Sequence, residues 1–100
     1  MKLQIQSIHF DADQKLLEYI QKKAEKLATF HDKIIDGEVI LKLDKDVNQE
    51  NKVVEFKINI PGTTVFVKER SKSFEAATDE ALEAAKTQLK KHKQKQVSYA

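Results

Sequence analysis

The fold is decided by a short stretch near the middle of the chain, Val54-Glu55-Phe56-Lys57-Ile58-Asn59-Ile60-Pro61-Gly62. Its first seven residues alternate apolar with polar side chains, which is the period of a half-buried β-strand. Pro61 and Gly62 supply the two central residues of a type II turn, and Thr63 to Arg70 returns as the next strand. This stretch therefore predicts two antiparallel strands that share one apolar face.

Strands are also predicted upstream of this hairpin. Val39, Leu41 and Leu43 point to one side of a strand, and a polar loop from Lys45 to Asn51 separates it from the hairpin. Residues 2–7 open the chain with the same alternation of apolar and polar side chains. The predicted sheet therefore has four strands.

Two segments have the apolar spacing of amphipathic helices. The first begins after the N-cap candidates Asp11 and Asp13, reaches about His31, and buries Leu16, Leu17, Ile20, Ala24, Leu27 and His31. The second begins after Ser73 as N-cap, and its inner face is Phe74, Ala77, Thr78, Ala81, Leu82, Ala85 and Leu89. The order of elements is β-α-β-β-β-α.

This order predicts a particular architecture. A helix that joins two strands makes a right-handed crossover between parallel strands, whereas short loops make the last three strands an antiparallel meander. One sheet face is polar, so both helices should cover the other; the polar face carries Gln4, Gln6, Lys42, Glu55, Lys57, Asn59, Lys68 and Arg70. We expect an α+β, two-layer sandwich with a four-stranded sheet and two helices packed on one face.

Composition indicates one folded domain. The chain has 100 residues, 40% of them apolar and 34% charged, with two glycines and one proline. The absence of cysteine excludes disulfides, thiolate metal sites and a cysteine nucleophile, and it fits a reducing compartment. No apolar run approaches the roughly 20 residues of a spanning helix. We expect a cytoplasmic protein without membrane contact.

Catalytic motifs are not found in the sequence. It has no Gly-rich phosphate loop, no G-x-S-x-G elbow and no Ser/His/Asp set. We therefore expect no catalytic residue, no cofactor and no small-molecule substrate.

One stretch of the sequence matches an EF-hand calcium loop only in part. Four residues match positions 1, 3, 5 and 12 of an EF-hand: Asp44, Asp46, Asn48 and Glu55. The sixth position is Gln49 instead of glycine, and Glu55 lies in a predicted strand. The three histidines, His9, His31 and His92, stand apart, and His31 is expected to pack at a helix end. We expect no metal site.

Charge is distributed unevenly along the chain. The net charge is +2, but residues 84–100 hold five lysines and no acid, whereas residues 34–83 hold seven basic and eleven acidic residues. Cations near a helix C-terminus interact favourably with its dipole. Five lysines exceed what one helix end requires, so the basic segment indicates an anionic partner.

Helical phase gathers the lysines into two ridges. At about 100° per residue, one face of the first helix carries Lys15, Tyr19, Lys22, Lys26 and Lys33. On the second helix, Lys86, Lys90 and Lys93 share a face away from the apolar line. Two helices side by side on one sheet would merge both ridges into one surface suited to RNA phosphates, and Tyr19 could stack on a base.

Several strings in the sequence, taken in register, resemble the ribosome hibernation promoting factor family, also called the ribosome-associated inhibitor or sigma-54 modulation family. The strings are Lys2-Leu3-Gln4-Ile5, residues 26–34 (Lys-Leu-Ala-Thr-Phe-His-Asp-Lys-Ile), Val39-Ile40-Leu41-Lys42-Leu43, Phe74-Glu75-Ala76-Ala77-Thr78-Asp79 and Gln88-Leu89-Lys90-Lys91-His92-Lys93. The last string is the most specific. The likeness spans about 95 residues, which we expect to form a ribosome-binding domain, residues 1–95, with a short tail at 96–100.

The resemblance implies a translation inhibitor that binds the small ribosomal subunit in the channel for mRNA and tRNA and acts as a plug. The ribosomal RNA contacts it implies are Lys22, Lys26, Lys86, Lys90, Lys91, His92 and Lys93, and the candidates for additional contacts are Lys15, Tyr19, Lys23 and Lys33. Glu75 replaces a frequent aromatic residue of the family, and the loop at 46–51 is longer and more acidic. The chain resembles a short form without the C-terminal module with which long members pair ribosomes, and we expect a monomer off the ribosome.

Two other functions remain open at this point. A double-stranded RNA-binding module that recognises A-form shape would also suit a two-layer sandwich with a basic helix end. Alternatively, the outer sheet face could serve protein interaction, with Ile40 and Phe66 as a small apolar spot.

Overall fold

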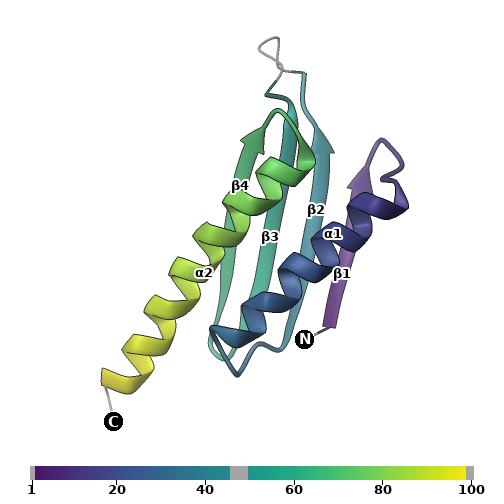
Figure 1. The fold of residues 1–100 in the computed structure, drawn as a ribbon. Coiled ribbons are helices and arrows are strands. Elements are labelled where there is room, and N and C mark those ends of the chain that lie inside the picture. Colours follow the sequence, from purple (N-terminus) through teal and green to yellow (C-terminus); the bar gives the residue numbers. More distant parts are fainter. Residues whose placement is uncertain (1, 46–49, 99–100) are drawn as a thin grey trace.

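The computed structural model describes residues 2–45 and 50–98, with the side chains of the last helix described as far as His92. Figure 1 shows a sheet with two helices laid across it. In chain order the elements are β1 (Lys2–Ile8), α1 (Gln14–Glu25), the 3-10 helix η1 (Lys26–Thr29), β2 (Asp36–Leu43), β3 (Lys52–Ile60), β4 (Thr63–Ser71) and α2 (Phe74–Ser98). The predicted α+β class and element order are confirmed.

The sheet has the predicted topology. Its strand order is β1-β2-β3-β4, with β1 parallel to β2 and the other neighbours antiparallel. The hairpin between β3 and β4 closes at Gly62, whose φ of +86° is the left-handed conformation that the third residue of a type II turn requires. Glycine adopts this conformation without a steric penalty, so the Pro61-Gly62 pair fixes the register of the hairpin.

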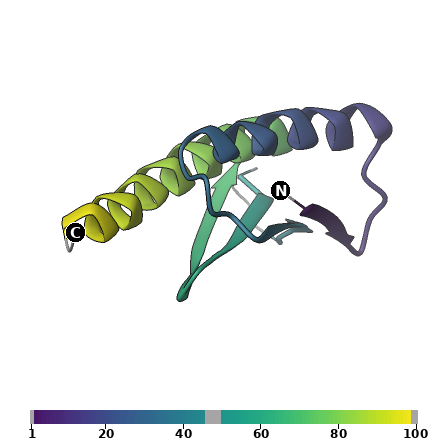
Figure 2. The same cartoon turned by 90° about the horizontal axis from the view of Figure 1, so that it is seen from below.

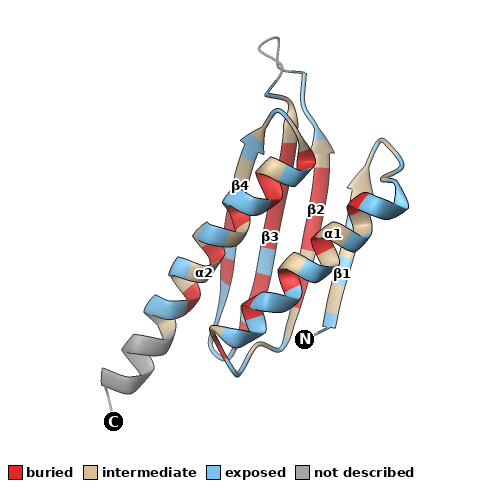
Figure 3. Ribbon diagram, viewed as in Figure 1, coloured by how far each residue is buried: buried red, intermediate tan, exposed pale blue. Residues whose placement is uncertain are grey.

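The core lies between the sheet and the two helices. Val39, Phe56 and Val67 are aligned across β2, β3 and β4, and Phe56 is fully buried. Figure 2 shows both helices on the same side of the sheet, and Figure 3 shows their buried faces turned toward it. α2 meets the sheet through Ala77, Ala81 and Ala85, all inaccessible to solvent, and such small side chains let a helix approach a sheet closely.

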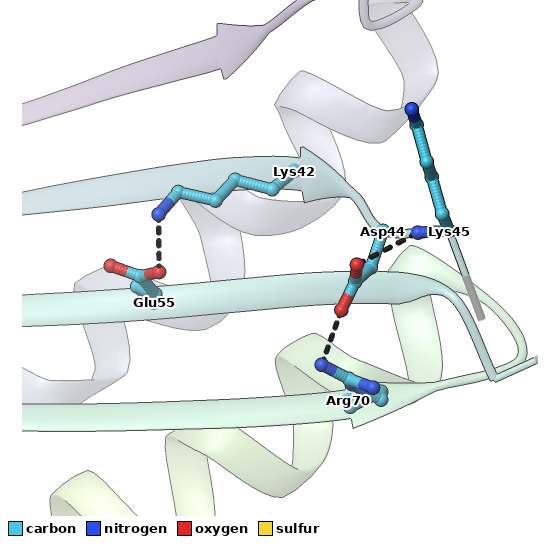
Figure 4. Close-up of polar contacts among 5 residues, drawn as sticks. All are labelled: Lys42, Asp44, Lys45, Glu55 and Arg70. Carbon is cyan, nitrogen blue, oxygen red and sulfur yellow. Dashed lines mark hydrogen bonds and ion pairs between the residues drawn. The ribbon is translucent and has the colours of Figure 1, made fainter.

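The outer sheet face is polar and carries its own ion pairs. Figure 4 shows Lys42 reaching Glu55, with Nζ 2.9 Å from Oε2, and Arg70 paired with Asp44. Glu55 is buried although no second layer covers it, because side chains of the neighbouring strands surround it.

Two sequence predictions about β2 and its surroundings are wrong. Leu43, predicted to point inward, is 47% exposed at the last position of β2. Ile40 and Phe66 do not form an apolar spot: Ile40 is buried opposite Glu55, whereas Phe66 lies on β4 opposite Lys57.

The first helix ends earlier than its apolar spacing predicts. Asp13 is its N-cap, with Oδ1 accepting the Leu16 N–H at 2.8 Å. At the other end the Thr29 hydroxyl donates to the Lys26 carbonyl at 2.7 Å, and buried His31 accepts the Lys33 N–H on Nδ1 at 3.1 Å. These side chains satisfy backbone groups that a continuing helix would use. Lys33 therefore lies past the helix, and its predicted place on the helical ridge is wrong.

Candidate functional site

The two helices run parallel, side by side, as Figures 1 and 2 show. At their N-terminal ends the rings of Phe10 and Phe74 stack with centroids 5.0 Å apart. At the C-terminal end of α1, Phe30, which follows η1, contacts Lys86 and Lys90 near the middle of α2. The parallel arrangement therefore brings the lysine-rich ends of both helices to the same end of the molecule.

Polar contacts join the helices midway. The Tyr19 hydroxyl donates a 2.7 Å hydrogen bond to Asp79 Oδ1, and Lys23 Nζ lies 3.8 Å from the same oxygen. The hydrogen bond to Asp79 raises the pKa of Tyr19 to about 12, with smaller contributions from burial and from the negative charges of Asp79 and Glu75. The hydroxyl of Tyr19 and the ammonium group of Lys23 are thus both engaged with α2.

A groove of about 440 Å³ lies between the C-terminal end of α1 with η1 on one side and the middle of α2 on the other. Its lining combines cationic, apolar and acidic side chains: Lys23, Lys26, Thr29, Phe30, Leu82, Glu83 and Lys86. Lys23 and Lys26 come from α1 and η1, and Lys86 comes from α2. We call this feature the interhelical groove.

Phe30 holds two lysines of α2 beside the groove. Lys86 Nζ lies 4.9 Å from the centroid of its ring and Lys90 Nζ lies 5.3 Å from it, both within the range of a cation–π contact. Lys86 is half-buried and Lys90 is exposed. The ring therefore restrains two ammonium groups without neutralising them.

Most of the predicted lysines are exposed and make no close ion pair among the described residues. Lys22, Lys26, Lys90 and Lys91 are exposed, and His92 is half-buried. Within residues 2–45 and 50–92, the ion pairs shorter than 4.0 Å are Lys23–Asp79, Lys42–Glu55 and Arg70–Asp44. Lys22, Lys26, Lys86, Lys90 and Lys91 thus have no ion pair of 4.0 Å or less to a carboxylate among the described residues. The side chain of Lys93 lies outside the described residues.

The structure gathers some predicted residues and separates others. Lys23, Lys26 and Lys86 line the interhelical groove, and Phe30 connects Lys90 to it. Lys15 lies in the first turn of α1, at the opposite end of that helix from Lys26. Lys33 lies between η1 and β2.

Sequence reasoning missed several residues that line the groove beside its lysines. Phe30, Leu82 and Glu83 were not identified as site residues, although all of them line it. An aromatic residue directly after a lysine-rich helix was the available signal for Phe30. Its contact with lysines 56 and 60 positions later depends on the packing of the two helices, which the sequence pattern alone does not show.

The described part of the chain offers neither a metal cluster nor a membrane-spanning helix. Residues 2–45 and 50–98 contain no group of three or more His, Cys, Asp or Glu side chains arranged to hold an ion. Of the calcium-loop residues, Asp44 pairs with Arg70 and Glu55 with Lys42, and Asp46 and Asn48 lie outside the described residues. No helix of this part is long and apolar enough to cross a membrane.

The fold and the groove define a class of protein. It is a small α+β sandwich in which lysines of both helices gather around one interhelical groove. Residues 3–97 match the family model described as Sigma 54 modulation protein / S30EA ribosomal protein. The chain belongs to this family.

Similar proteins agree with this assignment. A ribosome hibernation promoting factor of Pseudomonas putida is 34% identical over 98 residues, covering 98% of this chain and 92% of that protein. A ribosome hibernation promotion factor of Deinococcus radiodurans is 29% identical over 92 residues, covering 90% of this chain and 48% of that protein.

Solved structures show the same fold. The N-terminal domain of Thermus thermophilus Protein Y has a TM-score of 0.79 at 24% identity, covering 92% of this chain and 99% of that domain. A ribosomal subunit interface protein from Coxiella burnetii has a TM-score of 0.80 at 25% identity, covering 93% of this chain and 98% of that protein.

Proposed function

We propose that this chain is a ribosome-associated translation inhibitor that binds the small ribosomal subunit in the channel for mRNA and tRNA. Residues 1–95 form the binding domain, and ribosomal RNA is contacted by the lysines at the C-terminal ends of both helices. Translation is blocked because the bound domain occupies space that mRNA and tRNA need. The chain acts in the cytoplasm without a catalytic step, and it is a monomer off the ribosome.

One observation carries this proposal: the parallel helices place their lysine-rich ends together, and five of those lysines have no acidic partner among the described residues. Positioned ammonium groups bind RNA phosphates and release counterions. On the outer sheet face, by contrast, Lys42 and Arg70 are already paired with carboxylates. The names of the relatives from Pseudomonas putida and Coxiella burnetii support a ribosomal partner.

The test is co-sedimentation with purified small and large subunits. A variant with Lys86→Glu and Lys90→Glu should lose small-subunit binding and inhibition of translation in vitro, because reversed charges repel phosphates. The matched control is Lys57→Glu with Lys68→Glu, which changes the net charge equally on the outer sheet face. It should still bind.

Two outcomes would contradict the proposal. Co-sedimentation of the Lys86→Glu, Lys90→Glu variant at wild-type level would show that these helix ends do not contact RNA. Competition by free duplex RNA as strong as that by ribosomes would favour a general double-stranded RNA-binding module instead. Displacement of the bound protein by mRNA and tRNA, on the other hand, is expected if they share one channel.

A further inference from the structure

The interhelical groove has a shape and a chemistry that phosphate binding alone does not require. A surface that only contacts phosphates needs cations, but this groove is also lined by the apolar side chains of Phe30 and Leu82 and by the carboxylate of Glu83. Its volume of about 440 Å³ falls in the range of roughly 300–1,000 Å³ found for sites that hold one small organic molecule. A single nucleotide belongs to that size class, whereas a double helix does not enter a groove of this size.

We propose that the interhelical groove is a subsite for one unpaired nucleotide of RNA, with its base against Phe30 and Leu82 and its phosphate among Lys26, Lys86 and Lys90. This inference rests on the proposed function and adds that the RNA bound at this point is single-stranded. Unpaired bases offer their flat faces to aromatic side chains, which paired bases inside a helix do not.

The positions of the cations fit a phosphate at the rim of the groove. Lys26 lines one side on η1, Lys86 lines the other on α2, and the ring of Phe30 holds Lys86 and Lys90 at 4.9 and 5.3 Å. Two lysines restrained by one ring lose less freedom when they bind a phosphate than free side chains do. Phe30 therefore both contacts the base and positions two of the phosphate ligands.

Glu83 adds a preference among bases. Its carboxylate accepts hydrogen bonds and donates none, and among the described residues it has no ion-pair partner. Adenine, cytosine and guanine carry an exocyclic amino group that can donate to it. Uracil carries carbonyl oxygens on either side of its one N–H, and these repel a carboxylate. Uracil is therefore expected to bind weakest.

The test compares three RNA hairpins that share one stem: one with a single bulged adenosine, one with an abasic bulge, and one fully paired. Fluorescence anisotropy at constant salt should show binding about tenfold tighter for the bulged adenosine, within the effect of one stacked base. Phe30→Leu should abolish this preference, and Phe30→Tyr should retain it. Phe66→Leu, which removes an exposed ring from the outer sheet face, should leave it unchanged. Replacing the bulged adenosine by uridine should weaken binding, and Glu83→Gln should reduce that difference.

A second variant protects the test against misfolding of Phe30→Leu. Thr29 is exposed and lines the groove, so Thr29→Gln narrows the groove without touching the core. Thr29→Gln should also lower the preference for the bulged adenosine. Thr29→Ser, which keeps the hydroxyl that donates to the Lys26 carbonyl, is its control and should retain the preference. Equal affinity of the wild type for all three hairpins, together with salt-sensitive binding to small subunits, would overturn the subsite and leave the proposed function standing. Loss of the small-subunit binding as well would overturn the proposed function itself.

Discussion

The number of unpaired lysines at the helix ends predicts the salt dependence of RNA binding. Each phosphate neutralised by a lysine makes the slope of the logarithm of the binding constant K against the logarithm of the salt concentration more negative. The change is about 0.7 for single strands and about 0.9 for duplexes. If Lys22, Lys26, Lys86, Lys90 and Lys91 each contact one phosphate, the slope is about −3.5 to −4.5. Affinity then falls by about 100- to 500-fold between roughly 50 and 200 mM salt.

Removing two of these lysines gives a measurable change. In the double variant Lys86→Ala, Lys90→Ala the slope should become less negative by about 1.4 to 1.8. With the other three lysines alone in contact it is about −2.1 to −2.7, and affinity then falls by about 20- to 40-fold over the same salt range. Lys93 and Lys95 are present in both proteins, so they do not affect the difference between them. The assay is RNA binding by fluorescence anisotropy at five or more salt concentrations.

The control for this prediction is Lys57→Ala with Lys68→Ala, which removes the same charge from the outer sheet face. Its slope should equal that of the wild type. Equal slopes for wild type and the Lys86→Ala, Lys90→Ala variant would refute the reasoning, because they would show that neither lysine releases a counterion on binding. Equal losses of slope in both double variants would refute it as well, since binding would then depend on net charge and not on position.

Three further predictions concern stability. Phe56→Ala should lower the free energy of unfolding in urea by about 3–5 kcal/mol, since it opens a cavity at the centre of the sheet. If Phe56→Ala lowered this free energy less than Phe66→Ala does, the described core would be contradicted. The pKa of Tyr19 is raised to about 12, above its unfolded value of 10.0, so stability should fall as pH rises from about 10 to 12, and Tyr19→Phe should remove this part of the decline. Lys42→Ala leaves the buried Glu55 carboxylate without its ion-pair partner and should lower the free energy of unfolding by about 1–3 kcal/mol. Lys57→Ala is the control, and in the same unfolding experiment it should lower this free energy less.

Local sequence patterns predicted most of the fold because most of it depends on local rules. The alternation from Val54 to Ile60 identifies the buried face of β3, and Pro61-Gly62 identifies the turn. Ser73 and Asp13 were recognisable as caps, and Ser73 Oγ accepts the Ala76 N–H at 3.1 Å. Each of these signals involves residues within a few positions of one another.

Features that depend on tertiary packing could not be predicted in this way. The end of α1 depends on the side chains of Thr29 and His31, which replace helical hydrogen bonds, and apolar spacing does not report this. The burial of Ile40 and Glu55 depends on side chains from neighbouring strands. At the candidate site, helical phase identified the lysines, but their freedom from ion pairs and the role of Phe30 depend on how the helices meet.

The parallel course of α1 and α2 also governs how the molecule moves in an electric field. Acidic side chains such as Asp13, Glu75 and Glu80 lie at the ends where the helices begin, and the unpaired lysines lie where they finish. A chain with a net charge of only +2 thus has its unpaired lysines concentrated toward one direction along its helices. Near a polyanion, the resulting torque turns the lysine end forward before contact, which raises the fraction of productive collisions. Orientation during approach is thus a property of the helix arrangement, and net charge alone would not reveal it.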